Sequence, residues 1–586
     1  MPSLRTNKQK KRSPKLRARN LKLNKSKSRK HTVKKSRKGA TKKKTPLKVV
    51  ELFAGVGGFR VGLEKVLMGK AFKVVWSNQY EPGSSKQWAS WVYDYHWGKD
   101  KESKHSNKLV EEAIEAGDVP NKFDVLVGGF PCQDYSVAKP NNQSRGIEGK
   151  KGVLWWSIYQ IAEKHKPKYL ILENVDRLTK SPAKQRGRDF AIMLRCLQML
   201  GYHVEWRVIN AAEYGMPQRR RRVFIVGYHK DSELGRLMAK KSPSAILRHD
   251  GVLARALPCQ DEKRGVAEDD EISTQISKGK KVKGTTLQQE LFSEKENSLH
   301  NISITELPHQ LTDSFNYGNA VHTPFMSAGF SKALSDKADV YTYQVYSSHS
   351  GKSIQLGDLL IADKDVPKEF HIDAKSLDSW VYQKGGKSET RANYLTTFKS
   401  VTDLFASKGI KAELSRQQKM AWNKALSVYW EKHSDGGPGL ELTEVNSENK
   451  IHLDHAVIES TRFGYEFKEG PLPMPDPLER PMRTIITSEG GSSPSRFKHV
   501  VCRDCAKNWA KKRKPLNHDC VKSGSLRRLT PVELEKGNMF MPNHTRYAQV
   551  DGKKIEVDAR MRAFFMGNAL VCGVVQRIGE QLFDVV

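Results

Sequence analysis

Short apolar runs alternate with amphipathic stretches over residues 48–228. The runs are Val49–Phe53, Val74–Trp76, Val125–Val127, Tyr169–Leu172, His203–Val208 and Val223–Val226. Runs of this length predict buried strands, and the stretches between them are long enough for helices. Because strands that alternate with helices form βαβ units, the pattern predicts an α/β fold with a parallel sheet.

This regular pattern fades after residue 228. Polar, charged stretches such as Asp261–Lys283 and a Gly/Pro patch at Gly436–Gly439 follow, and helical periodicity returns in Val571–Leu582. These changes predict a chain of several parts, since domains usually hold about 100–200 residues. The parts are an arm over residues 1–47, an α/β domain over 48–228, a second domain with a long insertion over 229–526, and a C-terminal segment over 527–586.

The first part is strongly basic. Residues 1–47 contain 20 Lys and Arg residues, no Asp or Glu, and almost no large apolar side chains. Such a segment buries too little apolar surface to offset the entropy of folding, so we predict a disordered arm. Two interpretations stay open: a solubilising tail, or an arm that binds phosphates or serves as a nuclear address.

The whole chain is basic as well, with a formal net charge of +36 and a pI near 9.7. Without residues 1–47 the net charge is still about +16. Lys and Arg side chains that neutralise phosphates release condensed counterions, so this charge favours nucleic acid as the partner.

The seven cysteines do not form a pattern typical of a disulfide framework. No apolar stretch approaches the roughly 18–20 residues that span a bilayer, and the N-terminus lacks the apolar core of a signal peptide. We therefore expect a soluble protein of a reducing, intracellular compartment, with no membrane partner.

A glycine-rich turn follows the first predicted strand, at Phe53–Phe59. Glycines between a strand and a helix let a nucleotide-like ligand approach the backbone, although NAD, FAD and purely structural turns share this feature. The second strand ends at Ser77–Asn78 and is followed by Gln79, Tyr80 and Glu81. Amide and carboxylate groups can bind ribose hydroxyls there, and Tyr80 can stack on a base.

Cys132 lies in the sequence Phe130–Ser136, directly after the strand that contains Val125–Val127. A lone cysteine is usually a small buried hydrophobe, but ligands bind at the carboxyl ends of strands in open α/β sheets. A polar, glycine-containing loop over Ser136–Gly152 follows and can close over a substrate. The position predicts a nucleophile.

Glu173 ends the next strand and should therefore face the same edge of the sheet as Cys132. A surface carboxylate that caps a helix is the alternative. In the run Gln218–Arg222 the side chains alternate, so Gln218, Arg220 and Arg222 share one face of the strand that leads into Val223–Val226. A basic edge strand is the alternative here.

Taken in chain order, these motifs resemble those of the DNA (cytosine-5) methyltransferase family, and in particular of bacterial restriction-modification enzymes. Three later segments also match: Arg480–Thr487 resembles the end of the target-recognition domain, Arg527–Glu533 the ninth motif, and Gly567–Leu570 the tenth. The resemblance implies a Rossmann-like sheet of the S-adenosylmethionine-dependent type over residues 48–228. It also implies an irregular target-recognition domain over 229–526 and a last helix that returns to cover the cofactor.

By resemblance, one group of residues binds S-adenosylmethionine. It comprises Phe53, Gly55, Val56, Gly57, Gly58, Gln79, Tyr80, Glu81, Pro131, Leu154 and Asn568. The residue that holds the ribose stays open among Gln79, Tyr80 and Glu81, because the family's acid is replaced here by Gln79.

The catalytic set implied by the resemblance is Cys132, Glu173, Gln218, Arg220 and Arg222. A thiolate at Cys132 attacks carbon 6 of a flipped cytosine, and carbon 5 then takes the methyl group. Glu173 acts as general acid at ring nitrogen 3, Arg222 helps to hold the base, and Gln218 and Arg220 organise the site.

The expected substrate is a specific site in double-stranded DNA, and we expect a monomer that is paired with a restriction endonuclease. A cytoplasmic, nucleoid-associated location fits a bacterial protein, and a nuclear one a eukaryotic protein. Two alternatives remain: an RNA cytosine-5 methyltransferase of the same fold, and a catalytically idle DNA-binding scaffold.

Four further residues lie outside the family's pattern: Cys502, Cys505, His518 and Cys520. Three thiolates and an imidazole can hold zinc in a tetrahedron, although the His-x-Cys spacing is unusual. Four buried or incidental side chains are the alternative.

Overall fold

The computed structural model describes residues 44–130, 154–181, 188–260, 280–282, 326–332, 340–384, 442–445, 450–453, 456–459 and 472–585. The chain from Thr45 to Val586 forms one compact unit. The predicted arm lies almost wholly outside the described residues, so its disorder stays a prediction.

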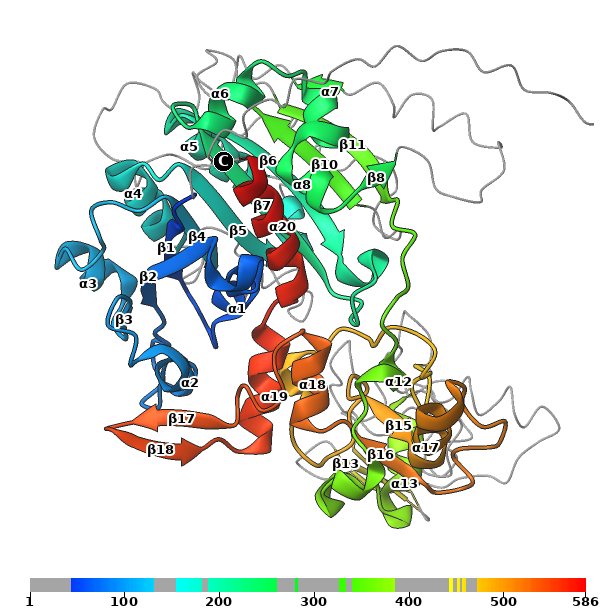
Figure 1. The fold of residues 1–586 in the computed structure, drawn as a ribbon. Coiled ribbons are helices and arrows are strands. Elements are labelled where there is room, and N and C mark those ends of the chain that lie inside the picture. Colours follow the sequence, from blue (N-terminus) through cyan, green and yellow to red (C-terminus); the bar gives the residue numbers. More distant parts are fainter. Residues whose placement is uncertain are drawn as a thin grey trace, which may run out of the picture. The chain divides into compact units, whose positions relative to one another are not determined.

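A large twisted sheet dominates the described structure (Figure 1). Its first seven strands run in the order β3-β2-β1-β4-β5-β7-β6. They are β1 (Leu47–Leu52), β2 (Phe72–Asn78), β3 (Lys104–Ser106), β4 (Val125–Gly129), β5 (Tyr169–Val175), β6 (Tyr202–Asn210) and β7 (Arg221–His229). All six apolar runs fall in strands, as predicted. Only β3 was missed, because its Lys-His-Ser sequence carries no apolar signal.

The prediction of a wholly parallel sheet is wrong for one strand. The pairs β1–β2, β1–β4, β4–β5 and β2–β3 are parallel, whereas β7 is antiparallel to both β5 and β6. Only residues 211–220, with the short turn η5 (Ala211–Tyr214), join β6 to β7. This connection is too short for the crossover that a parallel pair needs, so the chain turns back as a hairpin.

Helices cover both faces of the sheet. Alternate residues of each strand point to opposite faces, so Val49 and Ile171 join one apolar cluster while Val50 and Leu170 join the other. The first cluster includes residues of α1 (Gly58–Glu64), α8 (Val252–Ala256) and α20 (Cys572–Val585). The second includes residues of α3 (Val110–Glu115), α4 (Leu154–His165) and α5 (Arg188–Met199). Burial on both faces explains why the strands read as continuous apolar runs.

The sheet does not stop at residue 228, where we placed the end of the α/β domain. Strand β10 (Met326–Ser331) pairs with β6, and β11 (Val340–Ser347) pairs with β10, β8 (Cys259–Gln260) and β9 (Lys280–Val282). All of these added pairs are antiparallel. Part of the irregular stretch therefore extends the catalytic sheet.

The described residues form further helices and strands. They are α2 (Trp88–Trp97), α6 (Glu233–Ala239), α7 (Pro243–Ala245), α12 (Leu356–Leu359), α13 (Ala374–Gln383), β12 (Leu442–Val445), β13 (Lys450–Leu453), β14 (Ala456–Glu459), β15 (Val500–Cys502), α17 (Arg503–Lys512), β16 (Leu526–Arg528), α18 (Pro531–Gly537), β17 (Tyr547–Val550), β18 (Lys553–Glu556) and α19 (Ala559–Asn568). Among the described helices, none combines the length and the apolar character that crossing a membrane requires.

Candidate active site

The glycine-rich turn between β1 and α1 is tightly wound. Phe53, Gly55 and Gly57 all adopt positive φ angles, of 53°, 56° and 85°. A Cβ at Gly57 would lie 2.3 Å from the Trp97 ring, so that position must be glycine. At Gly55 a Cβ would meet no atom of the described residues within 4 Å. The turn therefore leaves open space in front of its backbone, as a bound cofactor needs.

Gln79 ties the end of β2 to this turn. Its side-chain Oε1 accepts a hydrogen bond from the backbone N–H of Gly55, at 2.8 Å. The bond uses the amide oxygen and leaves the amide NH2 group as the donor that a ribose hydroxyl can meet. Tyr80, the next residue, is 36% exposed and available for stacking. The backbone N–H and carbonyl of Glu81 bond to the Gln87 side chain, which fixes this bend.

A buried carboxyl group lies in the strand that leads into the turn, and the sequence analysis did not identify it. Glu51 in β1 is fully buried; its side chain accepts hydrogen bonds from the Tyr93 hydroxyl at 2.9 Å and from the Arg60 backbone N–H at 3.4 Å. Burial raises the pKa of Glu51 to about 7, against the lowering effect of Tyr93 and Arg60. The sequence signal that could have identified it is a single acidic residue within an otherwise apolar strand.

Arg60 completes this group. Its guanidinium forms ion pairs with Asp100 at 2.9 Å and Glu64 at 2.6 Å, and lies 4.8 Å from the Trp97 ring centre. These contacts hold α1 and α2 around the glycine turn.

The strand β4 ends beside the acid that the sequence singled out. Gly129 pairs in register with Glu173 of β5, and a Cβ at Gly129 would lie 3.1 Å from the Glu173 Oε2 atom. The absence of a side chain thus makes room for the carboxylate. Asn174 donates a hydrogen bond from Nδ2 to the Phe130 carbonyl at 3.2 Å, which anchors the last described residue of this segment.

Pro131 and Cys132, and the predicted loop over Ser136–Gly152, lie outside the described residues. The nucleophile assignment therefore stays a prediction. Leu154 is described as the first residue of α4 and packs against the second apolar cluster.

Glu173 does not end its strand as predicted, because β5 runs on to Val175. Glu173 and Arg222 form an ion pair between the neighbouring strands β5 and β7, near the carboxyl end of β5, which we call the sheet edge. The Arg222 Nε lies 2.9 Å from the Glu173 Oε1, and the two side chains are 16% and 12% exposed. Burial raises the pKa of Glu173, while Arg222 and Arg220 act in the opposite direction. A carboxyl with a raised pKa holds its proton to higher pH, as a general acid requires.

Gln218 and Arg220 have a different environment from Arg222, because β7 begins only at Arg221 and both residues precede it. Both are fully buried. The Gln218 Nε2 donates to Asn538 Oδ1 at 2.7 Å, and its Oε1 accepts from the Ile485 N–H at 3.1 Å.

The Arg220 guanidinium continues the same junction. It donates to the carbonyls of Ile485 at 2.9 Å and Gly567 at 2.8 Å. We call Gln218, Arg220, Ile485, Asn538 and Gly567 the buried junction. It joins two of the late segments that matched the family, at Ile485 and Gly567, to the residues that precede β7, and it also includes Asn538. The organising role expected for Gln218 and Arg220 stays a prediction.

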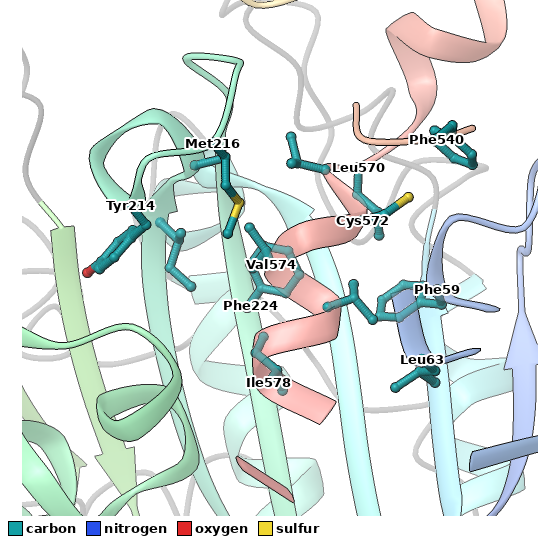
Figure 2. Close-up of a cluster of buried hydrophobic side chains, with 14 of the residues drawn as sticks. Phe59, Leu63, Tyr214, Met216, Phe224, Phe540, Leu570, Cys572, Val574 and Ile578 are labelled. Carbon is teal, nitrogen blue, oxygen red and sulfur yellow. The ribbon is translucent and has the colours of Figure 1, made fainter. Parts of the chain in front are cut away.

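The C-terminal segment packs against the helix that follows the glycine turn. A Cβ at Gly58 would lie 3.3 Å from the Leu570 side chain, and one at Gly62 would lie 2.7 Å from Val575. Figure 2 shows Val574 and Ile578 of α20 gathered with Phe59 and Leu63 of α1 and Phe224 of β7. Asn568 ends α19 and is exposed, and Val56 is buried with its carbonyl 2.8 Å from His544 Nε2.

Comparisons with known proteins point in one direction. A model of the C-5 cytosine-specific DNA methylase family matches residues 47–310. The Type II methyltransferase M.Sau3AI of Staphylococcus aureus is 34% identical over 538 residues, which cover 92% of this chain and 95% of that protein. M.NgoBI of Neisseria gonorrhoeae is 36% identical over 181 residues, covering 31% of this chain and 50% of that protein. A solved Entamoeba histolytica methyltransferase has a TM-score of 0.43 at 12% identity, over 92% of this chain and 99% of its own.

Proposed function

The chain belongs to the C-5 cytosine-specific DNA methylase family and is a DNA (cytosine-5) methyltransferase, and we propose that it acts through a covalent Cys132 adduct with a flipped cytosine. The observation that carries the proposal is the Glu173–Arg222 pair at the strand edge, two strands from the open glycine turn. In this proposal the acid and the methyl donor lie along the same edge of the sheet.

S-adenosylmethionine is the proposed methyl donor, and its sulfonium supplies an electrophilic methyl group. The open space at Gly55 suits it, because a side chain there would fill the room that the cofactor needs. In this proposal Gln79 binds a ribose hydroxyl, Tyr80 stacks on the adenine, and Asn568 at the end of α19 contributes to the same pocket. Phe53, Val56, Gly57 and Gly58 shape the turn.

The proposed chemistry at the cytosine uses two side chains in sequence. The Cys132 thiolate bonds to carbon 6, and Glu173 gives its proton to nitrogen 3, so that electron density reaches carbon 5. Carbon 5 takes the methyl group and then loses its own proton to a base. The carbon 6–sulfur bond breaks to release the Cys132 thiolate, and nitrogen 3 returns its proton to Glu173. Arg222 orients the Glu173 carboxyl through their ion pair and assists in holding the base.

The substrate proposed is a specific double-stranded DNA site. Neither face of a stacked cytosine is accessible to a thiolate, so the base must leave the helix. The net charge of +36 suits a polyanion. We further propose a monomeric, cytoplasmic enzyme that associates with the nucleoid and is paired with a restriction endonuclease.

Two alternatives make different predictions. The first is an RNA cytosine-5 methyltransferase, whose activity on labelled DNA would be inhibited by unlabelled RNA. The activity of the proposed enzyme would instead be inhibited by unlabelled duplex DNA. A DNA-binding scaffold would methylate neither.

Bisulfite sequencing of DNA from cells that express the chain tests the proposal. We expect protected cytosines at one short recurrent sequence, and none in cells that express Cys132→Ser. Cys259→Ser, which removes a cysteine from β8, serves as the matched control and should give the parent pattern. Unprotected DNA from cells with folded parent protein would contradict the proposal.

A further inference from the structure

Three cysteines and one histidine, distant from the glycine turn in sequence, come together around β15 and β16. Cys502 ends β15, Cys505 lies in the first turn of α17, and His518 and Cys520 lie in the segment that returns to β16. The His518 Nε2 lies 3.5 Å from the Cys502 Sγ and 3.4 Å from the Sγ atoms of Cys505 and Cys520. All four ligand atoms lie within 4.8 Å of one another.

The separations of 3.4–3.6 Å are close to those of a tetrahedral metal site. Zinc–sulfur and zinc–nitrogen bonds of about 2.3 and 2.0–2.1 Å place two ligands of a tetrahedron about 3.6–3.8 Å apart. The distance between the Cys505 and Cys520 Sγ atoms is 3.6 Å. One imidazole nitrogen carries at most one proton, so hydrogen bonding cannot account for three sulfur atoms around it.

We propose that Cys502, Cys505, His518 and Cys520 bind one zinc ion. Three soft thiolates and an imidazole in a tetrahedron favour zinc over the hard cations, which prefer oxygen ligands. Protein atoms fill all four positions, so the ion is structural and takes no part in methyl transfer. The backbone N–H of Cys505 points at the Cys502 Sγ, 3.4 Å away, and stabilises its negative charge.

The segment between β15 and β16 needs such an ion because it has little apolar core of its own. Of the residues of α17, only Cys505 and Trp509 are buried. The indole of Trp509 packs over Gly357, where a Cβ would lie 2.5 Å away, and its Nε1 donates to Asp358 at 3.0 Å. A metal that joins both ends of the segment replaces the missing core.

The same segment is strongly cationic. Its exposed side chains include Lys507, Lys511, Lys512, Arg513 and Lys514. Zinc therefore fixes the position of a group of positive charges next to the family's late motifs, where a DNA phosphate backbone can meet them.

Metal analysis of the purified full chain, prepared without chelators in zinc-containing medium, tests the proposal. We expect about one zinc per chain in the parent protein. In Cys505→Ser and Cys520→Ser the zinc content should fall by roughly tenfold or more. Cys259→Ser should keep the parent's zinc. A zinc-free parent, or full zinc content in Cys505→Ser, would overturn the site.

Cobalt substitution of the parent protein covers the case in which a ligand variant does not fold. Tetrahedral cobalt bound to sulfur gives strong visible absorption together with sulfur-to-metal charge transfer, and both should appear at one equivalent. Octahedral, weakly coloured cobalt would contradict the assignment. Because this readout needs neither DNA nor methyl transfer, its failure is distinguishable from failure of the proposed function.

Discussion

The two ends of the run Gln218–Arg222 differ in burial and in their bonding partners. At one end, Gln218 and Arg220 are fully buried and bond to the backbone or side chains of Ile485, Asn538 and Gly567. At the other end, Arg222 is partly exposed and meets Glu173 at the sheet edge. One motif thus joins the late segments to the sheet and also orients an acid.

The contrast shows that residues of one alternating run need not share a role. A buried guanidinium that bonds to two carbonyls stabilises the fold, because each carbonyl would otherwise lack a partner. A guanidinium at an edge, paired with one carboxylate, is available to a substrate. Stability and activity should therefore separate when the two ends are changed individually.

The largest expected effect is on the edge side, at Glu173. Glu173→Gln removes the proton that nitrogen 3 receives, so the methyl-transfer rate should fall by roughly 10²–10⁴-fold. The free energy of unfolding should not fall, since burial already disfavours the carboxylate. Single-turnover rates and chemical denaturation measure the two quantities. An unchanged rate would remove Glu173 from the chemistry.

The next effect is on the buried junction. Arg220→Met leaves the carbonyls of Ile485 and Gly567 without their donor, and should lower the free energy of unfolding by about 3 kcal/mol. Arg221→Ala is the neighbouring control: its ion pair with Asp176 is 3.5 Å long and partly exposed, so the change should stay within about 1 kcal/mol. If Arg220→Met lost activity without any loss in the free energy of unfolding, Arg220 would act in methyl transfer, as proposed for Arg222, rather than in the buried junction.

Glu51 is a second buried carboxyl, and it should affect stability rather than chemistry. Its pKa is about 7 in the folded protein, against 4.5 as the ordinary value. A raised folded pKa stabilises the protein at low pH, and this contribution is lost as pH rises from about 4.5 to about 7. Glu51→Gln removes that dependence, which amounts to about 3 kcal/mol across the window.

Denaturation of both proteins across this pH range measures the difference. The stability of Glu51→Gln relative to the parent should increase with pH. A difference that stayed constant with pH would mean that Glu51 is not shifted by burial.

The smallest expected effect is at Gly129. A Cβ there would lie 3.1 Å from Glu173 Oε2, so in Gly129→Ala the carboxylate must shift by a few tenths of an ångström. We expect about a tenfold loss in methyl-transfer rate, because catalysis depends on position. Gly117→Ala is unsuitable as a control because Gly117 has a positive φ of 70°. Gly227→Ala serves as a packing control. Because Gly227 faces Leu170 on β5, this change should lower the free energy of unfolding rather than the methyl-transfer rate.

Much of this site was predictable from the sequence. The strands and the glycine turn follow from short apolar runs and glycine spacing. The sequence also placed Glu173 next to the apolar run Tyr169–Leu172, but β5 continues past it to Val175. The antiparallel direction of β7 was not predicted, because an apolar run marks a buried strand but not its direction. The environments of Gln218 and Arg220 depend on Ile485 and Gly567, which are hundreds of residues away, so local alternation could not reveal them.

Mechanism-based trapping tests the central claim most directly. Duplex DNA that carries 5-fluorocytosine at the target site cannot lose the group on carbon 5, so the enzyme should remain bonded to it after methyl transfer. Mass spectrometry of the digested complex should find the modified base on Cys132, and Cys132→Ser should give no complex while Cys259→Ser does. A covalent complex through another residue, or one that persists in Cys132→Ser, would contradict the account.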